Sequence, residues 1–225
     1  DWIEADCYFG RGHMAGDQVE KSNPLKVPGR RSPKQERSKK TVELILEATL
    51  ELLEQEGFVG VTMQKIADRA DINVAAVYGY FPNKHQVIAE LHDRMFVARN
   101  EVRAECLKRQ LARGGDWVEN FVECLGEIAE WQCSQRGLAA LRNAMRASPS
   151  LWQLRMQYLD RTIDQITHYL DQADPDFVGD QRARARVIVE SVTAIIDLLQ
   201  SRNEGWPSPT ADQMMSMIRS YLRAD

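Results

Sequence analysis

The chain has 225 residues, 44% of them hydrophobic, which suits one domain or two small ones around an apolar core. It has no run of eighteen apolar residues, and so the sequence predicts no membrane partner. Its net charge is −4. The four cysteines form no C-x-x-C pair, which favours buried, reduced thiols and a cytoplasmic location. The four histidines form no cluster with cysteine or carboxylate, so we expect neither metal nor cofactor.

The first 33 residues differ in composition from the rest of the chain. Residues 1–14 lack periodicity and include Gly12-His13-Met14, which resembles an expression-vector junction, so they are left out of the fold. Residues 24–33 are rich in Pro, Gly and basic side chains, which predicts a disordered arm. Residues 21–40 carry eight basic side chains against one carboxylate, a charge of +7 that leaves −11 on the other 205 residues. Such a tail can simply be solvated, or it can contact DNA phosphates or the minor groove.

A first helix is predicted before residue 57. Apolar or small side chains recur there at helical spacing: Val42, Ile45, Leu46, Thr49, Leu52 and Leu53. Gly57 is expected to end this helix. We expect the apolar face to pack against Ile66, Val77 and Phe81, which gives a head of three helices.

Residues 62–84 are the most informative part of the chain. They read TMQKIADRADINVAAVYGYFPNK, a pattern of two short helices joined by a tight turn and followed by the start of a longer helix. Asn73 is a residue type that caps a helix by accepting a hydrogen bond, and Asn83 with Gln86 forms a capping-box-like start. Two short helices at such a turn form a helix-turn-helix, which places its second helix in the DNA major groove.

This segment resembles the tetracycline-repressor (TetR) family of bacterial transcription regulators. The residues that carry the resemblance are Thr62, Ile66, Ala67, Ala70, Ile72, Ala76, Val77, Tyr78, Tyr80, Phe81, Pro82 and Lys84. The resemblance covers about residues 38–95. The chain departs from the family at Ala75, where Gly is common, and at Gly79, where a bulkier residue is common. Gly79 either lets the backbone approach DNA or is simply tolerated.

The rest of the chain is predicted to be helical, so the fold class is all-α with about nine helices. The predicted helices after the head cover residues 84–111, 116–131, 135–147, 149–172, 181–202 and 209–223, and Ser148 with Pro149 is expected to cap the fourth of these. We divide the chain into a tag-like segment and basic arm (1–33), a helix-turn-helix domain (34–84) and a helical effector-binding and dimerisation domain (85–225).

The resemblance implies a set of DNA contacts. Phosphate contacts are expected from Arg37, Thr62, Tyr78, Tyr80 and Lys84, and base contacts from Gln64, Lys65, Asn73, Val74, Ala75 and Ala76, with Gly79 close to the backbone of DNA. Val and Ala offer only apolar contact to thymine methyls, so hydrogen-bonded discrimination falls mainly to Gln64, Lys65 and Asn73. For Tyr80 a packing role is the alternative.

The last two helices carry wide apolar stripes. The stripe residues are Ile188, Val192, Ile195, Leu199, Met214, Ile218 and Tyr221. The resemblance implies that these helices pair with a second copy in a four-helix bundle. A homodimer with two-fold symmetry reads a near-palindromic double-stranded operator. The alternative is that both helices lie inside a monomer.

The middle of the chain is rich in aromatic, methionine and arginine residues. The family usually holds a small-molecule effector here, and the candidates are Trp117, Phe121, Trp131, Arg142, Met145, Arg146, Trp152 and Met156. Aromatics at helical spacing also form plain core. Arg142 and Arg146 share a helix face; pointing inward they favour an anionic ligand, and pointing outward they are solvated.

These features favour a DNA-binding regulator, with repression as the family's usual mode and release by an effector. The alternative is an all-helical protein-interaction module that does not bind DNA. No catalytic motif is present, and Asp160 and Asp164 look like a surface pair, so we do not expect an enzyme.

Overall fold

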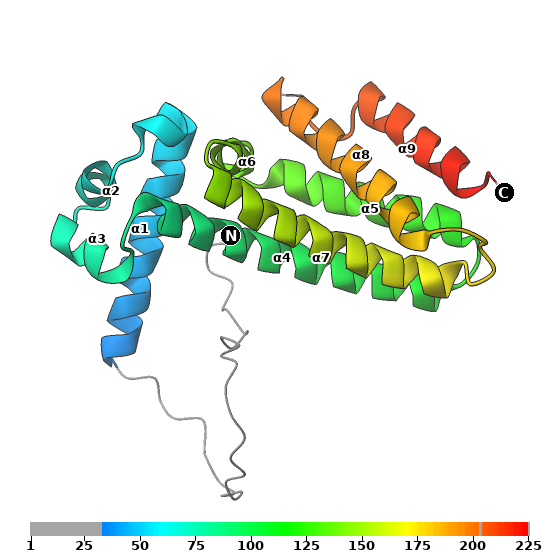
Figure 1. The fold of residues 1–225 in the computed structure, drawn as a ribbon, viewed down its shortest axis with the longest axis horizontal. Helices are drawn as coiled ribbons and strands as arrows, with labels where there is room; N and C mark the ends of the chain where they lie inside the picture. Colours follow the sequence, from blue (N-terminus) through cyan, green and yellow to red (C-terminus); the bar gives the residue numbers. More distant parts are fainter. Residues whose placement is uncertain (1–32, 203, 225) are drawn as a thin grey trace, which may run out of the picture.

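The computed structural model describes residues 33–202 and 204–224, with side chains from Arg37 onward. In this part of the chain there are nine helices and no strand (Figure 1). They are α1 (Pro33–Gly60), α2 (Met63–Arg69), α3 (Val74–Tyr80), α4 (Lys84–Arg113), α5 (Trp117–Ser134), α6 (Leu138–Arg146), α7 (Pro149–Ala173), α8 (Gln181–Ser201) and α9 (Pro209–Leu222). The predicted all-α class is confirmed. The predicted tag and nearly all of the predicted arm lie outside the described residues.

Local sequence signals set most helix starts. Asn73 Oδ1 accepts from the Ala75 amide at 2.8 Å, and Asn83 accepts from the Gln86 amide at 3.1 Å, as predicted. Gly57, with φ of 66° and ψ of −178°, is non-helical and ends the first part of α1 as predicted, and a short helical piece follows it to Gly60. One prediction needs correction. Ser148 precedes α7 but makes no capping bond, because its Oγ lies 3.1 Å from Ser150 Oγ; Pro149 supplies the helical start.

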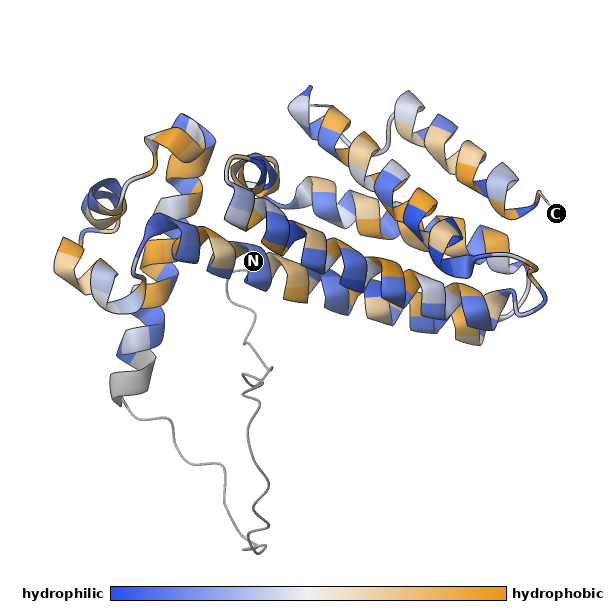
Figure 2. Cartoon of the chain, viewed as in Figure 1, coloured by the Kyte–Doolittle hydropathy of each residue, from blue (hydrophilic) through white to orange (hydrophobic). Residues whose placement is uncertain are grey.

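The head consists of α1, α2, α3 and the first turns of α4, at the left of Figure 1. Its interior is an apolar cluster that includes Ile45, Ile66 and Val77, all fully buried, with half-buried Phe81 packed against it. The predicted packing of the first helix on the helix-turn-helix is therefore confirmed. Figure 2 shows hydrophobic and hydrophilic residues interspersed along α1, and the buried hydrophobic ones belong to this cluster.

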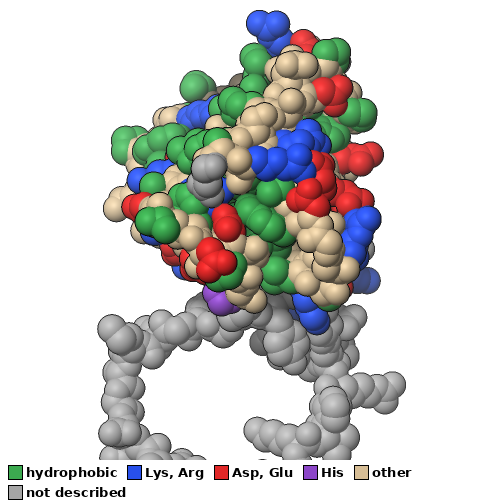
Figure 3. Space-filling model, turned by 90° about the vertical axis from the view of Figure 1, so that its right-hand side faces the viewer, with side chains coloured by type: hydrophobic (Ala, Val, Ile, Leu, Met, Phe, Trp, Pro, Cys, Tyr) green, Lys and Arg blue, Asp and Glu red, His purple; other side chains and the backbone are tan. Residues whose placement is uncertain are grey.

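The body consists of the rest of α4 and of α5–α9. The long helices α4 and α7 lie side by side, α8 packs on α5 and α7, and α9 lies beyond α5 and α8 (Figure 1). A second apolar cluster, which includes Phe121, Ile163 and Ile188, fills the body away from the head. On the end of the body away from the head, basic and acidic side chains lie among hydrophobic ones (Figure 3).

Two connections join head and body. The first is α4, which begins in the head at Lys84 and runs through the body. The second is α6, which packs on α1: Gly137 precedes α6 with φ of 73°, and a Cβ there would lie 2.5 Å from Leu50 Cδ1. Next to it, Arg136 donates to Glu47 at 2.6 Å and to Glu54 at 3.0 Å. The body is therefore packed closely against α1 at this point.

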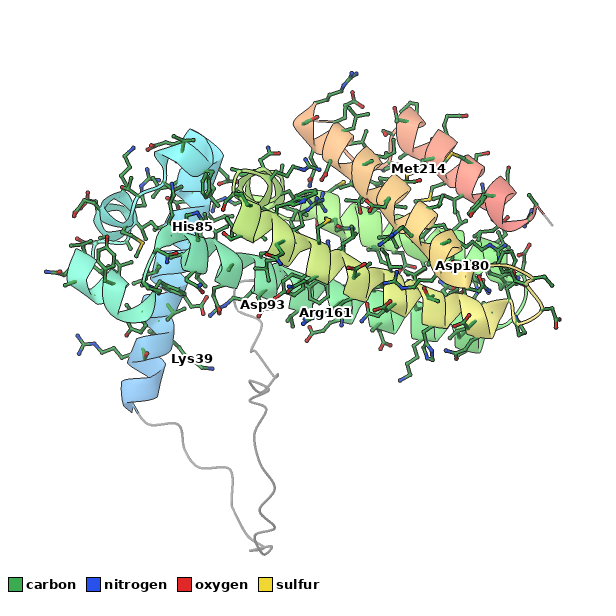
Figure 4. All side chains as sticks on the ribbon, in the orientation of Figure 1. Lys39, His85, Asp93, Arg161, Asp180 and Met214 are labelled. Atoms are coloured by element: carbon green, nitrogen blue, oxygen red, sulfur yellow. The ribbon has the colours of Figure 1, made fainter. Side chains whose placement is uncertain are left out.

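A groove of about 720 Å³ separates the head from α7. It is lined by side chains of α3, α4 and α7, including Tyr80, His85, Asp93 and Tyr158. Figure 4 labels His85 and Asp93 along α4, and marks the head with Lys39 and the far end of the body with Asp180. The Tyr158 hydroxyl donates to Asp93, which holds α7 against α4 below this groove.

Candidate DNA-binding surface and effector site

The predicted recognition helix α3 presents one face outward. Val77 is fully buried in the head, whereas Ala75, Ala76, Tyr78 and Gly79 are exposed. A Cβ at Gly79 would meet nothing within 4 Å, so no packing contact in the free protein requires glycine there. The exposed face is therefore small and smooth, a shape that lets a helix approach the floor of a major groove.

The predicted base-reading side chains are largely occupied in the free protein. Gln64 Nε2 donates to Asp68 Oδ1 at 2.7 Å, and the Lys65 ammonium pairs with Glu56. Asn73 Oδ1 caps α3, which leaves its amide NH₂ as the group free to donate. Val74 is half-buried against the head core and has little surface to offer a base.

The predicted phosphate-contacting residues divide into two kinds. Arg37, Thr62, Tyr78 and Tyr80 are exposed, although the Thr62 hydroxyl also caps α2 by accepting from the Lys65 amide at 3.2 Å. Lys84 is tied to the head instead: its Nζ donates to the carbonyls of Phe58 and Val61, both at 2.9 Å. The ammonium lies 4.2 Å from the centre of the Phe58 ring, and burial lowers the pKa of Lys84. The Lys84 side chain therefore binds backbone carbonyls at the C-terminal end of α1 and just after it.

The apolar stripe predicted for dimerisation mostly faces inward. Ile188, Val192, Leu199, Met214 and Ile218 are buried in the protomer's own core, because α8 and α9 pack on α5 and α7. Those five positions are a correction to the sequence-based prediction. Ile195 is half-buried and Tyr221 is exposed.

A different stripe on the same helices is exposed. Its large members are Val187 and Leu198 on α8 and Met217 and Tyr221 on α9, each 39% exposed or more. Exposed Ala194 lies between the two α8 residues. Figure 1 shows α8 and α9 side by side on one side of the body. The stripe is thus one face with no covering element from the described part of the chain.

The eight predicted effector residues do not converge on one pocket. Met145 and Trp131 join the apolar cluster of the head, whereas Phe121 and Trp117 join the cluster at the other end of the body. Trp152 is exposed and Met156 half-buried. The exceptions are Arg142 and Arg146, which meet at the same carboxylate, Asp197 of α8.

Asp197 is the centre of a group of arginines, called here the arginine cluster (Arg99, Arg142, Arg146 and Arg155). Arg142 donates to Asp197 at 2.9 Å and to Gln132 at 2.6 Å, and it is only 5% exposed. Arg155 approaches Asp197 to 3.6 Å. Burial, followed by the charges of other arginines, lowers the pKa of Arg99 well below its usual value. Arg103 is one of these neighbours and donates to Gln165 at 2.6 Å.

His92 borders the same cluster. It is 9% exposed, its ring lies 4.8 Å from that of Tyr158, and its Nδ1 has no hydrogen-bond partner. Desolvation, then the charges of Arg99, Arg155 and Arg142, lower the pKa of His92 from 6.5 to about 3. The side chain is therefore neutral at physiological pH.

Sequence reasoning missed His92, Arg99 and Asp197. The helical spacing of the sequence could have indicated the two α4 residues. His92 and Arg99, with Arg103, lie on the α4 face that also carries buried Met95 and Cys106. A polar side chain at an inward position marks a buried polar site. In the described residues, no three His, Cys, Asp or Glu side chains group as metal ligands, and no helix is long and apolar enough to cross a membrane.

The architecture is that of an all-helical regulator, with a helix-turn-helix head on a larger helical body. Residues 45–91 match the family model described as "Bacterial regulatory proteins, tetR family". The solved structure of the SmeT–triclosan complex has a similar fold, with a TM-score of 0.66. The alignment covers 81% of this chain and 91% of that chain, and 18% of the aligned residues are identical. The head is therefore a helix-turn-helix domain of the TetR type, and the chain as a whole shares the fold of solved TetR-like regulators.

Two curated relatives match short stretches of the chain. One is an uncharacterised HTH-type transcriptional regulator in the dhlA 5′ region of Xanthobacter autotrophicus, 41% identical over 54 residues. The other is the HTH-type transcriptional repressor KstR of Mycobacterium tuberculosis, 38% identical over 52 residues. These matches cover 24% and 23% of this chain and only 27% and 24% of the relatives. Over most of its length, the chain is therefore related to known regulators by its fold.

Proposed function

We propose that the protein is a transcriptional repressor that binds a palindromic operator as a homodimer and is released by a small molecule bound in its body. The observation that carries the proposal is the exposed face of α3, where Ala75, Ala76, Tyr78 and Gly79 face outward while Val77, and partly Val74, pack against the head. KstR, which is similar to a stretch of this chain, is described as a repressor. SmeT, which shares the fold, has a solved structure as a complex with triclosan.

The DNA contacts proposed from this geometry are narrower than the sequence suggested. Ala75, Ala76 and Gly79 would approach the bases, and the amide NH₂ of Asn73 would donate to a base acceptor. Arg37, Thr62, Tyr78 and Tyr80 would contact phosphates, with Lys84 holding the end of α1 in place. Since few of these groups read base edges, DNA shape would supply part of the specificity.

Selection of bound duplexes from a random pool, at two salt concentrations, tests this proposal. We expect enrichment of a palindrome, with affinity that falls steeply as salt rises because phosphate contacts release counterions. No enrichment above non-specific binding, together with a partner that binds independently of salt, would support the protein-interaction module instead.

The dimer surface we propose is the exposed stripe of Val187, Ala194, Leu198, Met217 and Tyr221. An apolar face of this kind on two adjacent helices suits pairing with its own copy around a two-fold axis. Leu198→Glu would put a charge at that face and convert the dimer to monomers, as measured by sedimentation velocity. Val178→Glu is the matched control, because Val178 is 97% exposed on the loop between α7 and α8.

A further inference from the structure

A pocket of about 300 Å³ opens between α6 and α8. Arg142, Asn143 and Arg146 line it from α6, and Asp197, Leu198 and Gln200 from α8. Pockets that hold small molecules or their head groups begin at about this size. The pocket adjoins the arginine cluster, since Arg142 and Arg146 belong to both and Asp197, which pairs with three of the four arginines, also lines it.

The cluster holds more positive than negative charge. Asp197 pairs with Arg142, Arg146 and Arg155, and in the described part of the chain no second carboxylate pairs with any member of the cluster. Glu190, exposed on α8, adds a weaker attraction to Arg155. Four guanidinium groups thus share one close carboxylate, an imbalance that is costly where water is excluded.

Hydrogen-bond donors in the cluster also lack acceptors. Arg99 Nε is buried without a partner, and its Nη1 reaches Gln132 Oε1 only at 3.4 Å. Beside the cluster, His92 Nδ1 is a second buried polar atom without a partner, and it donates in the tautomer that carries the proton on Nδ1. By contrast, Arg142 donates to Asp197, Gln132 and Gln200, which leaves part of its five-donor guanidinium available to a further acceptor. Buried donors normally find acceptors, so the unmet groups around a net positive charge indicate an absent anion.

We propose that the arginine cluster binds an anionic group, a carboxylate or a phosphate, of a small molecule that enters between α6 and α8. Guanidinium groups bind both anions with paired, charge-assisted hydrogen bonds. Exposed Arg146 would meet the anion first, and Arg142 and Arg155 would share it. Only the description of this ligand as the effector rests on the proposed function.

The same geometry links the anion to the head. Arg142 and Arg146 lie on α6, which contacts α1 through Gly137 and Leu50. An anion that competes with Asp197 for these arginines changes the bond between α6 and α8. The position of α6, and with it the spacing of two heads in a dimer, would follow.

The test is thermal unfolding of the full chain at constant ionic strength in sodium chloride, sodium benzoate or inorganic phosphate. We expect benzoate or phosphate to raise the Tm by about 3 °C or more over chloride. The shift should be lost in Arg146→Gln and in Arg155→Met and kept in Arg182→Gln, which removes a surface arginine paired with Asp160 and Asp164.

The outcomes separate cleanly. A shift with benzoate alone assigns a carboxylate, and one with phosphate alone assigns a phosphate. No shift with either anion, or an equal shift in Arg146→Gln, overturns the proposal. Arg155→Met in chloride gives a second readout: relief of excess charge should leave its Tm unchanged or raised, whereas a loss of several degrees would identify the cluster as purely structural.

DNA binding by the same samples keeps this proposal apart from the proposed function. Palindrome binding without any anion-dependent Tm shift would overturn the anion site and leave the repressor in place. An anion-dependent Tm shift without DNA binding would support the site and overturn the repressor.

Discussion

The head and the body are both built of helices, but their buried interiors differ in polarity. The buried interior of the head is mostly apolar: among the described side chains of α1–α3, buried Thr49 donates to the Ile45 carbonyl at 2.7 Å, and Glu43 Oε2 is a buried atom without a partner. The body buries Arg142 and His92 and leaves polar atoms of His92 and Arg99 unpartnered. A mostly apolar interior favours one shape, whereas an interior with buried charges and unpartnered donors stabilises the free protein less and can respond to a ligand. We therefore expect the head to present a fixed surface and the body to respond to ligands.

The strongest way to break this comparison is to alter the surface of the head without altering its interior. Ala76→Asp would place a carboxylate on the exposed face of α3, where it repels DNA phosphates, so we expect at least about a 100-fold loss of operator affinity. Fluorescence anisotropy measures this loss. Ala183→Asp, on exposed residue 183 of α8, is the control and should bind as the unchanged protein does. Full affinity in Ala76→Asp would remove α3 from the DNA interface.

The contact between α6 and α1 is tested by a substitution that adds a side chain at Gly137. Gly137→Ala puts a Cβ against Leu50 at a positive φ, and we expect the free energy of unfolding to fall by about 2–4 kcal/mol. Urea denaturation provides the measurement. Gly126→Ala is the matched control, because nothing lies within 4 Å of its Cβ position inside α5, and it should stabilise by up to about 1 kcal/mol. Equal effects at the two glycines would mean that α6 and α1 are not tightly packed.

The polar interior of the body predicts a dependence of stability on pH. His92 has a folded pKa of about 3 against 6.5 unfolded, so between these values the unfolded chain binds a proton that the folded chain does not. Stability therefore falls as pH drops below 6.5, by about 1.4 kcal/mol per pH unit for this group. Urea unfolding from pH 6 to 4 should show a shallower slope in His92→Gln. Identical slopes would place His92 in a solvated setting.

The smallest expected effect is at Lys84, where a substitution distinguishes a packing role from a DNA contact. Lys84→Ala removes the hydrogen bonds to the carbonyls of Phe58 in α1 and Val61 just after it, and should lower the free energy of unfolding by about 1–2 kcal/mol. If the third donor of its ammonium also contacts a phosphate, affinity for all DNA sequences falls and the salt slope drops by about one. Lys108→Ala, at an exposed position of α4, is the control. An unchanged salt slope would assign Lys84 to the head alone.

Much of the fold was readable from the sequence because its signals are local. Asn73, Asn83 and Asp116 cap the helices they were expected to begin, and Gly114 follows the end of α4. The site was less readable. The sequence grouped Arg142 with Arg146 correctly, but it could not show that Asp197, some fifty residues further along, joins them.

By itself the sequence determined the helices, the helix-turn-helix and the family, since caps, turns and the Tyr78–Lys84 segment depend on neighbours a few residues away. The tertiary structure decided which face of each helix is available. It turned Ile188 and Met214 inward and Leu198 and Met217 outward, and it gathered arginines from α4, α6 and α7 around one carboxylate of α8. Helical periodicity identifies an apolar face, but only packing decides whether this chain or a partner covers it.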